Sequence, residues 1–321
     1  MRQLPEQISK TASQSEKPPV DVLIDTDIGD DIDDALALSV ALNSPEIAVH
    51  AITTVFGDTQ RRAQLVAYLL HTFGHDDIPV AAGIQSPLQF RHRPSGVPQA
   101  AILPVLSGHE TYSAISSLTG PELIIQTALA YSGRLTLVCI GPLTNIATAL
   151  TLEPQLFTAI RSIVMMGGSS GLPLPDWNVR SDAKAAQIVL ASGIPVTMVG
   201  LNITSRCKLR ACDIAQLQSS NTLQAQLLSR LLVVWQEHRS RWHSRLPYLH
   251  DPLTVAALCN PALFRFQDMT ARVLTHGPLQ GFTVPRFMHG PIVNAVVDVQ
   301  VGQAREWVMQ RLIASSHTQT T

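Results

Sequence analysis

The sequence has few charged residues and no excess of either sign. Lys and Arg number 23 against 24 Asp and Glu, and charged residues make up 15% of the 321 residues, against roughly 25% in an average soluble domain. Binding to phosphates needs a dense basic face, so this balance argues against a nucleic-acid-binding protein. The apolar runs are also short, the longest lying near 135–140, whereas a membrane span needs about 20 apolar residues. We therefore expect neither a nucleic acid nor a membrane among its partners.

Paired cysteines and a secretory leader are missing as well. The four cysteines show no spacing of the zinc or redox type, and free thiols are typical of a reducing cytoplasm; they are Cys139, Cys207, Cys212 and Cys259. Residues 1–19 are polar and contain no apolar stretch like that of a signal peptide. We predict a disordered N-terminal extension over 1–19, one domain over 20–315, a tail over 316–321, and a cytoplasmic location.

Short β-branched runs alternate along the chain with amphipathic stretches. Such alternation predicts βαβ units and a mostly parallel sheet that is buried on both faces. No linker interrupts it, so we predict a single large α/β domain, doubly wound and Rossmann-like, with helices on both faces. The expected strands are 20–24, 47–55, 78–82, 135–140, 162–166, 195–199 and 294–299. The expected helices are 33–43, 61–73, 122–131, 143–150, 183–191, 223–245, one after 251, and 304–313.

One segment concentrates negative charge. Seven of the 24 acidic residues lie within fourteen residues, and no Lys or Arg occurs between Lys17 and Arg61; the seven are Asp21, Asp25, Asp27, Asp30, Asp31, Asp33 and Asp34. Capping of a helix explains about two of the six acids from Asp25 to Asp34, and a hard cation would relieve the repulsion among the rest. Calcium accepts 6–8 oxygen ligands with flexible geometry. The EF-hand pattern does not fit, because Gly29 comes one place early and no Glu closes a twelve-residue loop.

An aspartyl-phosphate (haloacid dehalogenase-like) phosphatase is an alternative interpretation. Its signature, Asp-x-Asp-x-Thr/Val after a first strand, matches the run from Asp25 to Ile28, but Gly29 stands where Thr or Val should be. This alternative makes Asp25 the nucleophile and requires magnesium.

The acidic segment also resembles the hallmark of the inosine/uridine-preferring nucleoside hydrolase family, which is Asp-Thr-Asp-x-Gly followed by an Asp-Asp-Ala helix start. Four further segments resemble family motifs in the expected order, and a fifth, Asp176-Trp177-Asn178, is similar to the family's Glu-Phe-Asn. The four are 53–58, 141–147, 164–168 and His250-Asp251-Pro252. Each motif alone is weak, but the resemblance extends over about residues 20–313.

The resemblance implies hydrolysis of the N-glycosidic bond of ribonucleosides with a tightly bound Ca²⁺, through an oxocarbenium-like transition state. It implies that Asp27 is a metal ligand and the base that activates water, with further ligands from Asp34, Asp251 and the backbone carbonyl of Ile140. His250 would give a proton to the departing base, since its charge changes near neutral pH. The residues implied to hold the ribose hydroxyls are Asp33, Asp58, Asp176 and Asn178. The resemblance also implies a homodimer or homotetramer.

Several positions depart from the family pattern. Two extra residues separate Asp27 from the helix start, so the second acidic position falls on Asp30-Asp31 or on Asp33-Asp34, and Asp31 remains a candidate ligand. Asp58 stands where many members carry Asn, Asp176 where many carry Glu, and Ser170 near a ribose-binding Asn. These changes leave the preference for purine or pyrimidine nucleosides open.

Two smaller points also stay open. Trp242 and His243 are weak candidates for the base pocket. A calcium-bound nucleoside- or sugar-binding protein without turnover is a non-enzymatic alternative.

Overall fold

The computed structural model describes residues 18–89, 96–104, 112, 114–238, 245–286 and 289–314. The predicted N-terminal extension up to residue 17, the predicted tail, and Trp242 and His243 lie outside the described residues.

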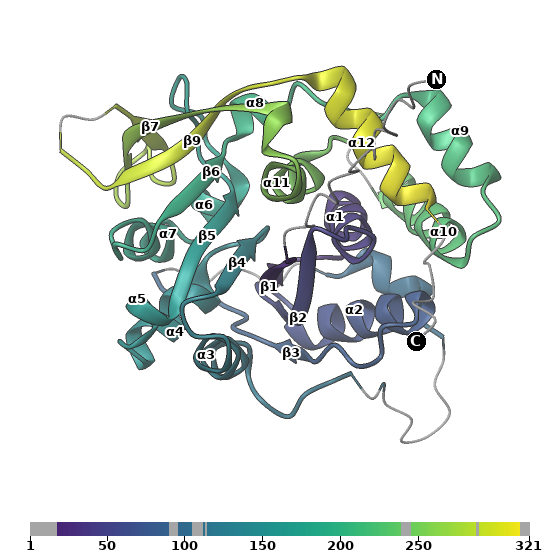
Figure 1. The fold of residues 1–321 in the computed structure, drawn as a ribbon, viewed down its shortest axis with the longest axis horizontal. Coiled ribbons are helices and arrows are strands. Elements are labelled where there is room, and N and C mark those ends of the chain that lie inside the picture. The colour runs from purple at the N-terminus through teal and green to yellow at the C-terminus, as the bar shows by residue number, and fades with distance from the viewer. Residues whose placement is uncertain are drawn as a thin grey trace, which may run out of the picture.

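A nine-stranded sheet forms the centre of the molecule (Figure 1), in the order β3-β2-β1-β4-β5-β6-β9-β7-β8. The strands from β3 to β9 in this order run parallel, and β7 and β8 are antiparallel additions at one edge. Their bounds are β1 Val20–Thr26, β2 Ile47–Thr54, β3 Val80–Ala82, β4 Leu135–Cys139, β5 Ile160–Met166, β6 Val196–Val199, β7 Phe264–Val273, β8 Thr283–Pro285 and β9 Ile292–Val299.

Helices cover both faces of the sheet because the central strands carry apolar side chains on both sides. In β1, Val22 and Ile24 belong to one buried core while Leu23 belongs to the other. The first core packs against α1 Asp33–Leu42, α2 Thr59–Phe73, α10 Leu223–His238, α11 His250–Cys259 and α12 Val301–Ile313. The second packs against α3 Gly120–Ala130, α4 Thr144–Leu152, α5 Leu156–Ala159 and α7 Ala183–Leu190. The predicted doubly wound, mostly parallel fold is confirmed.

Shorter elements connect these layers. They are α6 Trp177–Ser181, α8 Leu201–Thr204, α9 Ala211–Ser219 and the 3-10 helices η1 Pro98–Ile102 and η2 Pro261–Leu263. The sequence pattern missed the antiparallel pair β7 and β8. In β7 the exposed and buried positions do not alternate regularly, so the strand lacks the period of two that marks a strand with one buried face.

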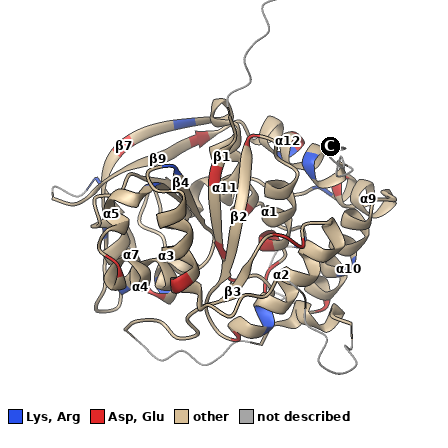
Figure 2. Cartoon of the chain, turned by 60° about the horizontal axis from the view of Figure 1, so that its bottom comes forward, with Lys and Arg blue, Asp and Glu red and all other residues tan. Residues whose placement is uncertain are grey.

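Charge is sparse on the folded chain, as in the sequence. Among the described residues, the Lys and Arg positions in Figure 2 are short separate segments and not one continuous basic face. Within the same residues, no helix combines the length and the apolar character needed to cross a membrane.

Candidate active site

Polar loops follow the carboxyl ends of the parallel strands, and these ends lie at one edge of the sheet. Thr26, the last residue of β1, pairs with Thr54 at the end of β2, and Asp25 pairs with Cys139 at the end of β4. Ligands bind at this edge in open parallel sheets. The acidic segment runs along β1, through the loop 27–32 (the acidic loop) and into the start of α1, so most of its carboxylates lie where the architecture places a ligand.

Three buried carboxylates converge at this edge. Asp33 and Asp34 begin α1 and Asp251 lies in the first turn of α11, two helices that pack together. One oxygen from each lies within 4.8 Å of the others, and the Thr26 hydroxyl donates a 2.5 Å hydrogen bond to Asp34. Residues far apart along the chain, at the starts of α1 and α11, thus form one acidic group.

Asp27 lies beside this group and shares its electrostatic environment. Burial raises the pKa of Asp27 to about 7, although the positive charge of Arg62 opposes the shift. Burial also raises the pKa values of Asp33, Asp34 and Asp251 well above the ordinary range, and the charge of Asp27 adds to each increase. Without a counterion these four acids repel one another in a region that water does not screen.

The donor set fits a hard divalent cation. All side-chain donors in the group are carboxylate oxygens, the ligands that calcium and magnesium prefer. Oxygens bound to one calcium ion at 2.3–2.6 Å lie at most about 5 Å apart, and the 4.8 Å spread of the three oxygens agrees with this limit. Such an ion would offset part of the negative charge that the four acids carry when they are ionised.

The remaining predicted metal ligands lie at the margin of this group. Asp31 is exposed, and its Oδ1 accepts a hydrogen bond from the backbone N–H of Ile32, although its charge still acts on Asp33. The Ile140 carbonyl accepts a 3.0 Å hydrogen bond from Asn178. Next to it, a Cβ at Gly141 would lie 3.1 Å from Oδ1 of Asp27, so glycine permits the close approach of these two segments. The structure groups Asp33, and not Asp31, with Asp34 and Asp251.

Asp25 has a different role from the other acids of the segment. It is fully buried, and its Oδ1 accepts hydrogen bonds from Thr53 at 2.5 Å and Asn145 at 2.8 Å. Asp25 therefore ties the ends of β1 and β2 to the start of α4. A carboxylate enclosed in this way cannot reach a phosphate ester, which removes the nucleophile that the phosphatase interpretation needs.

The predicted ribose-binding acids begin helices. Asp58 is the exposed N-cap of α2 and accepts from the backbone N–H of Arg61. Asp176 is the buried N-cap of α6 and accepts from the backbone N–H of Val179 at 2.9 Å, and burial raises its pKa to about 6. Asn178 donates to the backbone carbonyls of Ile140 and Met166. Asn178 thus links the ends of β4 and β5 at the sheet edge.

His250 is placed at the site, but the expected titration near neutral pH is wrong. Removal of the ring from water lowers the pKa of His250 to about 4, so the imidazole is neutral at pH 7. Its Nδ1 lies 2.7 Å from the Thr204 hydroxyl, and its ring stacks on Tyr248 with centroids 5.0 Å apart. The sequence argument took the pKa of a solvated histidine, and the packing of Tyr248 and Thr204 could not be read from the motif.

Sequence reasoning missed Arg62 and Trp177. Arg62 of α2 is fully buried and donates to the backbone of the acidic loop. A signal for Arg62 exists in the sequence, since it shares the buried face of α2 with Leu65, Val66 and Leu69 at helical spacing. The Trp177 ring meets Phe56 edge-on at 6.0 Å, and its indole N–H donates to Asp27, which lowers the pKa of that carboxyl.

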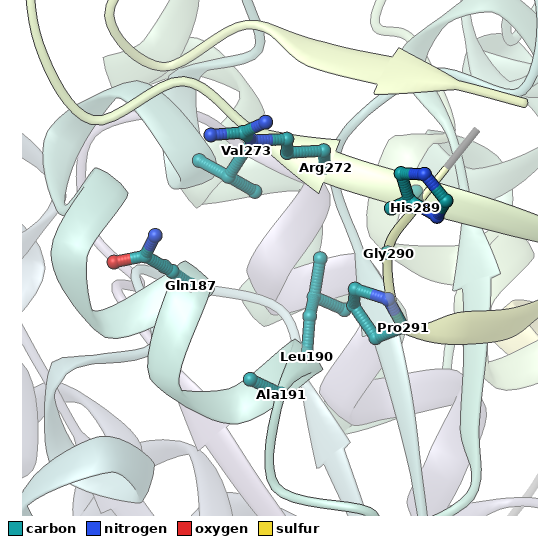
Figure 3. A pocket seen from close by; sticks show the side chains of 9 residues that line it. Gln187, Leu190, Ala191, Arg272, Val273, His289, Gly290 and Pro291 are labelled. Carbon is teal, nitrogen blue, oxygen red and sulfur yellow. The ribbon is translucent and has the colours of Figure 1, made fainter. Parts of the chain in front are cut away.

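A separate pocket lies beside β7 (Figure 3). Its volume is about 170 Å³, and its lining joins the C-terminus of α7, the 271–273 part of β7, and the segment 289–291. Gln187, Arg272 and His289 contribute its polar side chains, and none of the predicted site residues lines it. This pocket is therefore not the candidate active site.

The metal-free protein is expected to become less stable as pH rises from about 4 to 7. The folded chain keeps protons on Asp25 and Asp27 up to a pKa of about 7, and on Asp176 up to about 6, whereas the ordinary value is 3.8. In this window the folded state binds more protons than the unfolded state, so the free energy of unfolding falls with increasing pH. Thermal melts in EDTA should give a lower Tm at pH 8 than at pH 5.5.

A bound cation should change this dependence. Cation binding requires deprotonated carboxylates, so the gain in Tm on adding calcium should be larger at pH 8 than at pH 5.5. A Tm in EDTA that rises between these pH values would contradict the raised pKa values.

Comparison with known proteins gives a consistent result. Residues 22–307 match the inosine-uridine preferring nucleoside hydrolase family. The chain is 33% identical to "Probable uridine nucleosidase 2" of Arabidopsis thaliana, covering 92% of this chain and 98% of that protein. It is 36% identical to a pyrimidine-specific ribonucleoside hydrolase of Salmonella paratyphi A, covering 87% of this chain and 93% of that protein.

Solved structures agree with the sequence relatives. A plant nucleoside hydrolase superimposes with a TM-score of 0.82 at 28% identity, covering 92% of this chain and 100% of that one. A purine-preferring ribonucleoside hydrolase from Gardnerella vaginalis gives a TM-score of 0.80 at 25% identity, with coverages of 91% and 98%. The chain therefore belongs to the inosine-uridine preferring nucleoside hydrolase family of N-glycosyl hydrolases.

Proposed function

We propose that this protein hydrolyses the N-glycosidic bond of ribonucleosides to ribose and a free base, with Ca²⁺ as its cofactor. The observation that carries the proposal is the buried group of Asp33, Asp34 and Asp251 beside Asp27. Its all-oxygen donor set suits a hard cation, and it lies at the sheet edge where ligands bind in this architecture.

Asp27, Asp34, Asp251 and the Ile140 carbonyl would hold the ion, with Asp33 beside them and Asp31 at the exposed margin. When bound, calcium supplies positive charge that orients water and makes it more acidic. The Asp27 carboxylate accepts the proton that this water loses as it attacks C1′ of the ribose.

The ribose is held by acids and an amide. We assign this role to Asp33, Asp58, Asp176 and Asn178, whose oxygens accept hydrogen bonds from sugar hydroxyls. Fixing the sugar in the geometry of the oxocarbenium-like transition state contributes to the rate because the reacting atoms are already aligned.

The neutral imidazole of His250 assists the departing base. When the Thr204 hydroxyl donates to Nδ1 across 2.7 Å, the ring proton lies on Nε2, from which the neutral imidazole donates a hydrogen bond to the departing base and keeps its proton. Because the pKa of His250 is lowered to about 4, this assistance does not depend on a protonated imidazolium.

Pyrimidine ribonucleosides, uridine first, are the proposed substrates. The two sequence relatives described above are named for uridine and for pyrimidine ribonucleosides. We also propose a cytoplasmic location, with which the four free cysteines agree, and assembly as a homodimer or homotetramer, as the family resemblance implies.

A release assay tests the activity directly. The purified protein is incubated with calcium and uridine, cytidine, inosine or adenosine, and free ribose is measured over time. We expect release from uridine and cytidine to exceed release from the purine nucleosides, and EDTA to abolish it.

The assay also separates the alternatives. Ribose release from inosine or adenosine alone would contradict the pyrimidine preference but keep the activity. Nucleoside binding, measured calorimetrically, without ribose release from any of the four would replace the enzyme by the binding-protein alternative.

A further inference from the structure

The backbone carbonyls of the acidic loop are held from outside the loop by two distant residues. The Arg62 Nη1 donates to the carbonyls of Asp27 and Ile28, the latter at 2.6 Å, and its Nη2 pairs with the Asp30 carboxylate at 2.6 Å. The Gln99 backbone N–H donates to the carbonyl of Gly29 at 3.1 Å, and its side-chain amide donates to the carbonyl of Asp31 at 2.6 Å. These bonds hold four carbonyls of the loop, those of Asp27, Ile28, Gly29 and Asp31.

Arg62 also holds the neighbouring strand end. Its Nε donates to the carbonyl of Phe56 at 2.7 Å, and the N–H of Phe56 donates to the carbonyl of Ile84 at 2.9 Å. Phe56 has a φ of 68°, a left-handed conformation that is strained for a bulky residue and persists only when its surroundings enforce it. One guanidinium therefore joins the turn after β2 to the loop after β1.

Burial of the Arg62 charge is costly, so its hydrogen bonds must offset that cost. The side chain is fully buried, and taking a charge out of water is costly unless its donors are satisfied. Its ion-pair partner Asp30 is 39% exposed, so the pair contributes less than a fully buried one would. The backbone carbonyls of Asp27, Ile28 and Phe56 accept hydrogen bonds from other N–H groups of the guanidinium. These bonds fix the position of the backbone.

We propose that Arg62, assisted by Gln99, is a positioning residue that fixes the acidic loop so that Asp27, Asp33 and Asp34 reach the geometry required for cation binding and catalysis. The kinetic consequence rests on the proposed function. The clamp, meaning the hydrogen bonds of Arg62 and Gln99 to the loop, is a property of the fold.

The planar geometry of the Arg62 guanidinium allows its role in positioning the loop to be tested separately from its positive charge. Three nitrogens at fixed angles serve three carbonyls and one carboxylate, an arrangement that a lysine ammonium cannot reproduce. Arg62→Lys keeps the positive charge and loses the fork, whereas Arg62→Gln loses both. If Arg62 positions the loop, the two variants behave alike; if it supplies only charge, lysine restores function.

The experiment measures three quantities on the full chain. Calorimetric titration with Ca²⁺ should give an affinity about 10- to 100-fold lower in Arg62→Gln, as is typical when a residue that orients metal ligands is lost. Arg62→Lys should lie within about 3-fold of that variant, and kcat for uridine at saturating Ca²⁺ should fall by at least about 10-fold in both. Hydrogen exchange of a peptide covering 27–34, measured in EDTA, should be faster in both variants.

Arg311→Gln is the matched control. Arg311 is a largely buried arginine in α12 whose Nη2 pairs with Glu46 at 2.6 Å, remote from the acidic loop. This substitution is expected to lower Tm without changing Ca²⁺ affinity, kcat or exchange in 27–34. A loss of function in the Arg62 variants beyond that of the control therefore reports position and not general stability.

The outcomes are decisive. Wild-type Ca²⁺ affinity and wild-type exchange in a folded Arg62→Gln variant would overturn the proposal, as would full rescue by Arg62→Lys. If neither variant folds, Asp30→Asn and Gln99→Met each remove one contact and should lower Ca²⁺ affinity by about 2- to 10-fold; unchanged affinity in both would overturn it. If the wild type neither binds Ca²⁺ nor hydrolyses nucleosides, the proposed function fails. The exchange rates of the 27–34 peptide then decide by themselves whether Arg62 holds the loop.

Discussion

Asp27→Asn is expected to lower kcat for uridine hydrolysis by about 10²- to 10⁴-fold, the contribution of a general base. An amide cannot accept the proton that the attacking water loses, while its size and much of its hydrogen bonding are retained. Because Asp27 is buried beside three further acids, the substitution also removes repulsion, and the variant should fold at least as well as the wild type. Steady-state kinetics at saturating Ca²⁺ measure the effect.

Asp21→Asn is a suitable control for this substitution. Asp21 lies at the start of the same strand and pairs with His50 at 2.7 Å and with Arg134 at 3.4 Å, at the end of β1 opposite the site. Its neutralisation should leave kcat within about 2-fold of wild type, since partly exposed ion pairs contribute roughly 0–1 kcal/mol. An Asp27→Asn variant with wild-type kcat would show that another group accepts the proton.

Asp251→Asn is expected to have opposite effects on metal binding and on stability. Loss of one of three converging carboxylates should lower Ca²⁺ affinity by about 100-fold or more, since a ligand itself matters at least as much as the groups that orient it. In EDTA the same variant should melt at a higher temperature than the wild type. Burial and the charges of Asp33 and Asp34 raise the pKa of Asp251, so neutralising it removes an unfavourable charge. Calorimetry and thermal melts measure the two effects.

Asp213→Asn provides a control of opposite sign. Asp213 is also buried, and burial alone would raise its pKa, but hydrogen bonds and charge from Arg210, together with the charge of Arg305, lower it. Neutralising Asp213 should therefore lower Tm with or without calcium. If Asp251→Asn lowered Tm in EDTA as Asp213→Asn does, the acidic group would not be electrostatically strained.

The parallel core of the fold could be predicted from the sequence because the strands are buried on both faces. Runs such as 135–140 read as continuous apolar segments between helices, and the observed β4 covers all but the last residue. The antiparallel strand β7 escaped because it combines charged Arg265 and Asp268 with buried Met269 in no regular period. Its position depends on pairing with β9, which is a tertiary property.

The site could be predicted only as far as local motifs reach. The strand end placed Asp27 at the sheet edge, and the family resemblance added Asp34 and Asp251, which the structure groups with Asp33. The choice between Asp31 and Asp33 needed the three-dimensional path of the loop. The lowered pKa of His250 and the role of Arg62 arise from packing across the chain. Such packing leaves at most a faint trace in a single sequence.

The separation of Asp34 and Asp251 along the chain has a consequence for biosynthesis. About two thirds of the chain lies between them, so the ribosome releases the acidic loop long before the helix that completes the acidic group. Until α11 docks on α1, the nascent chain holds an incomplete set of ligands and can bind a cation only weakly. Under the proposed function, tight calcium binding would therefore require the last fifth of the chain, and the ion would favour the fully assembled chain over truncated products.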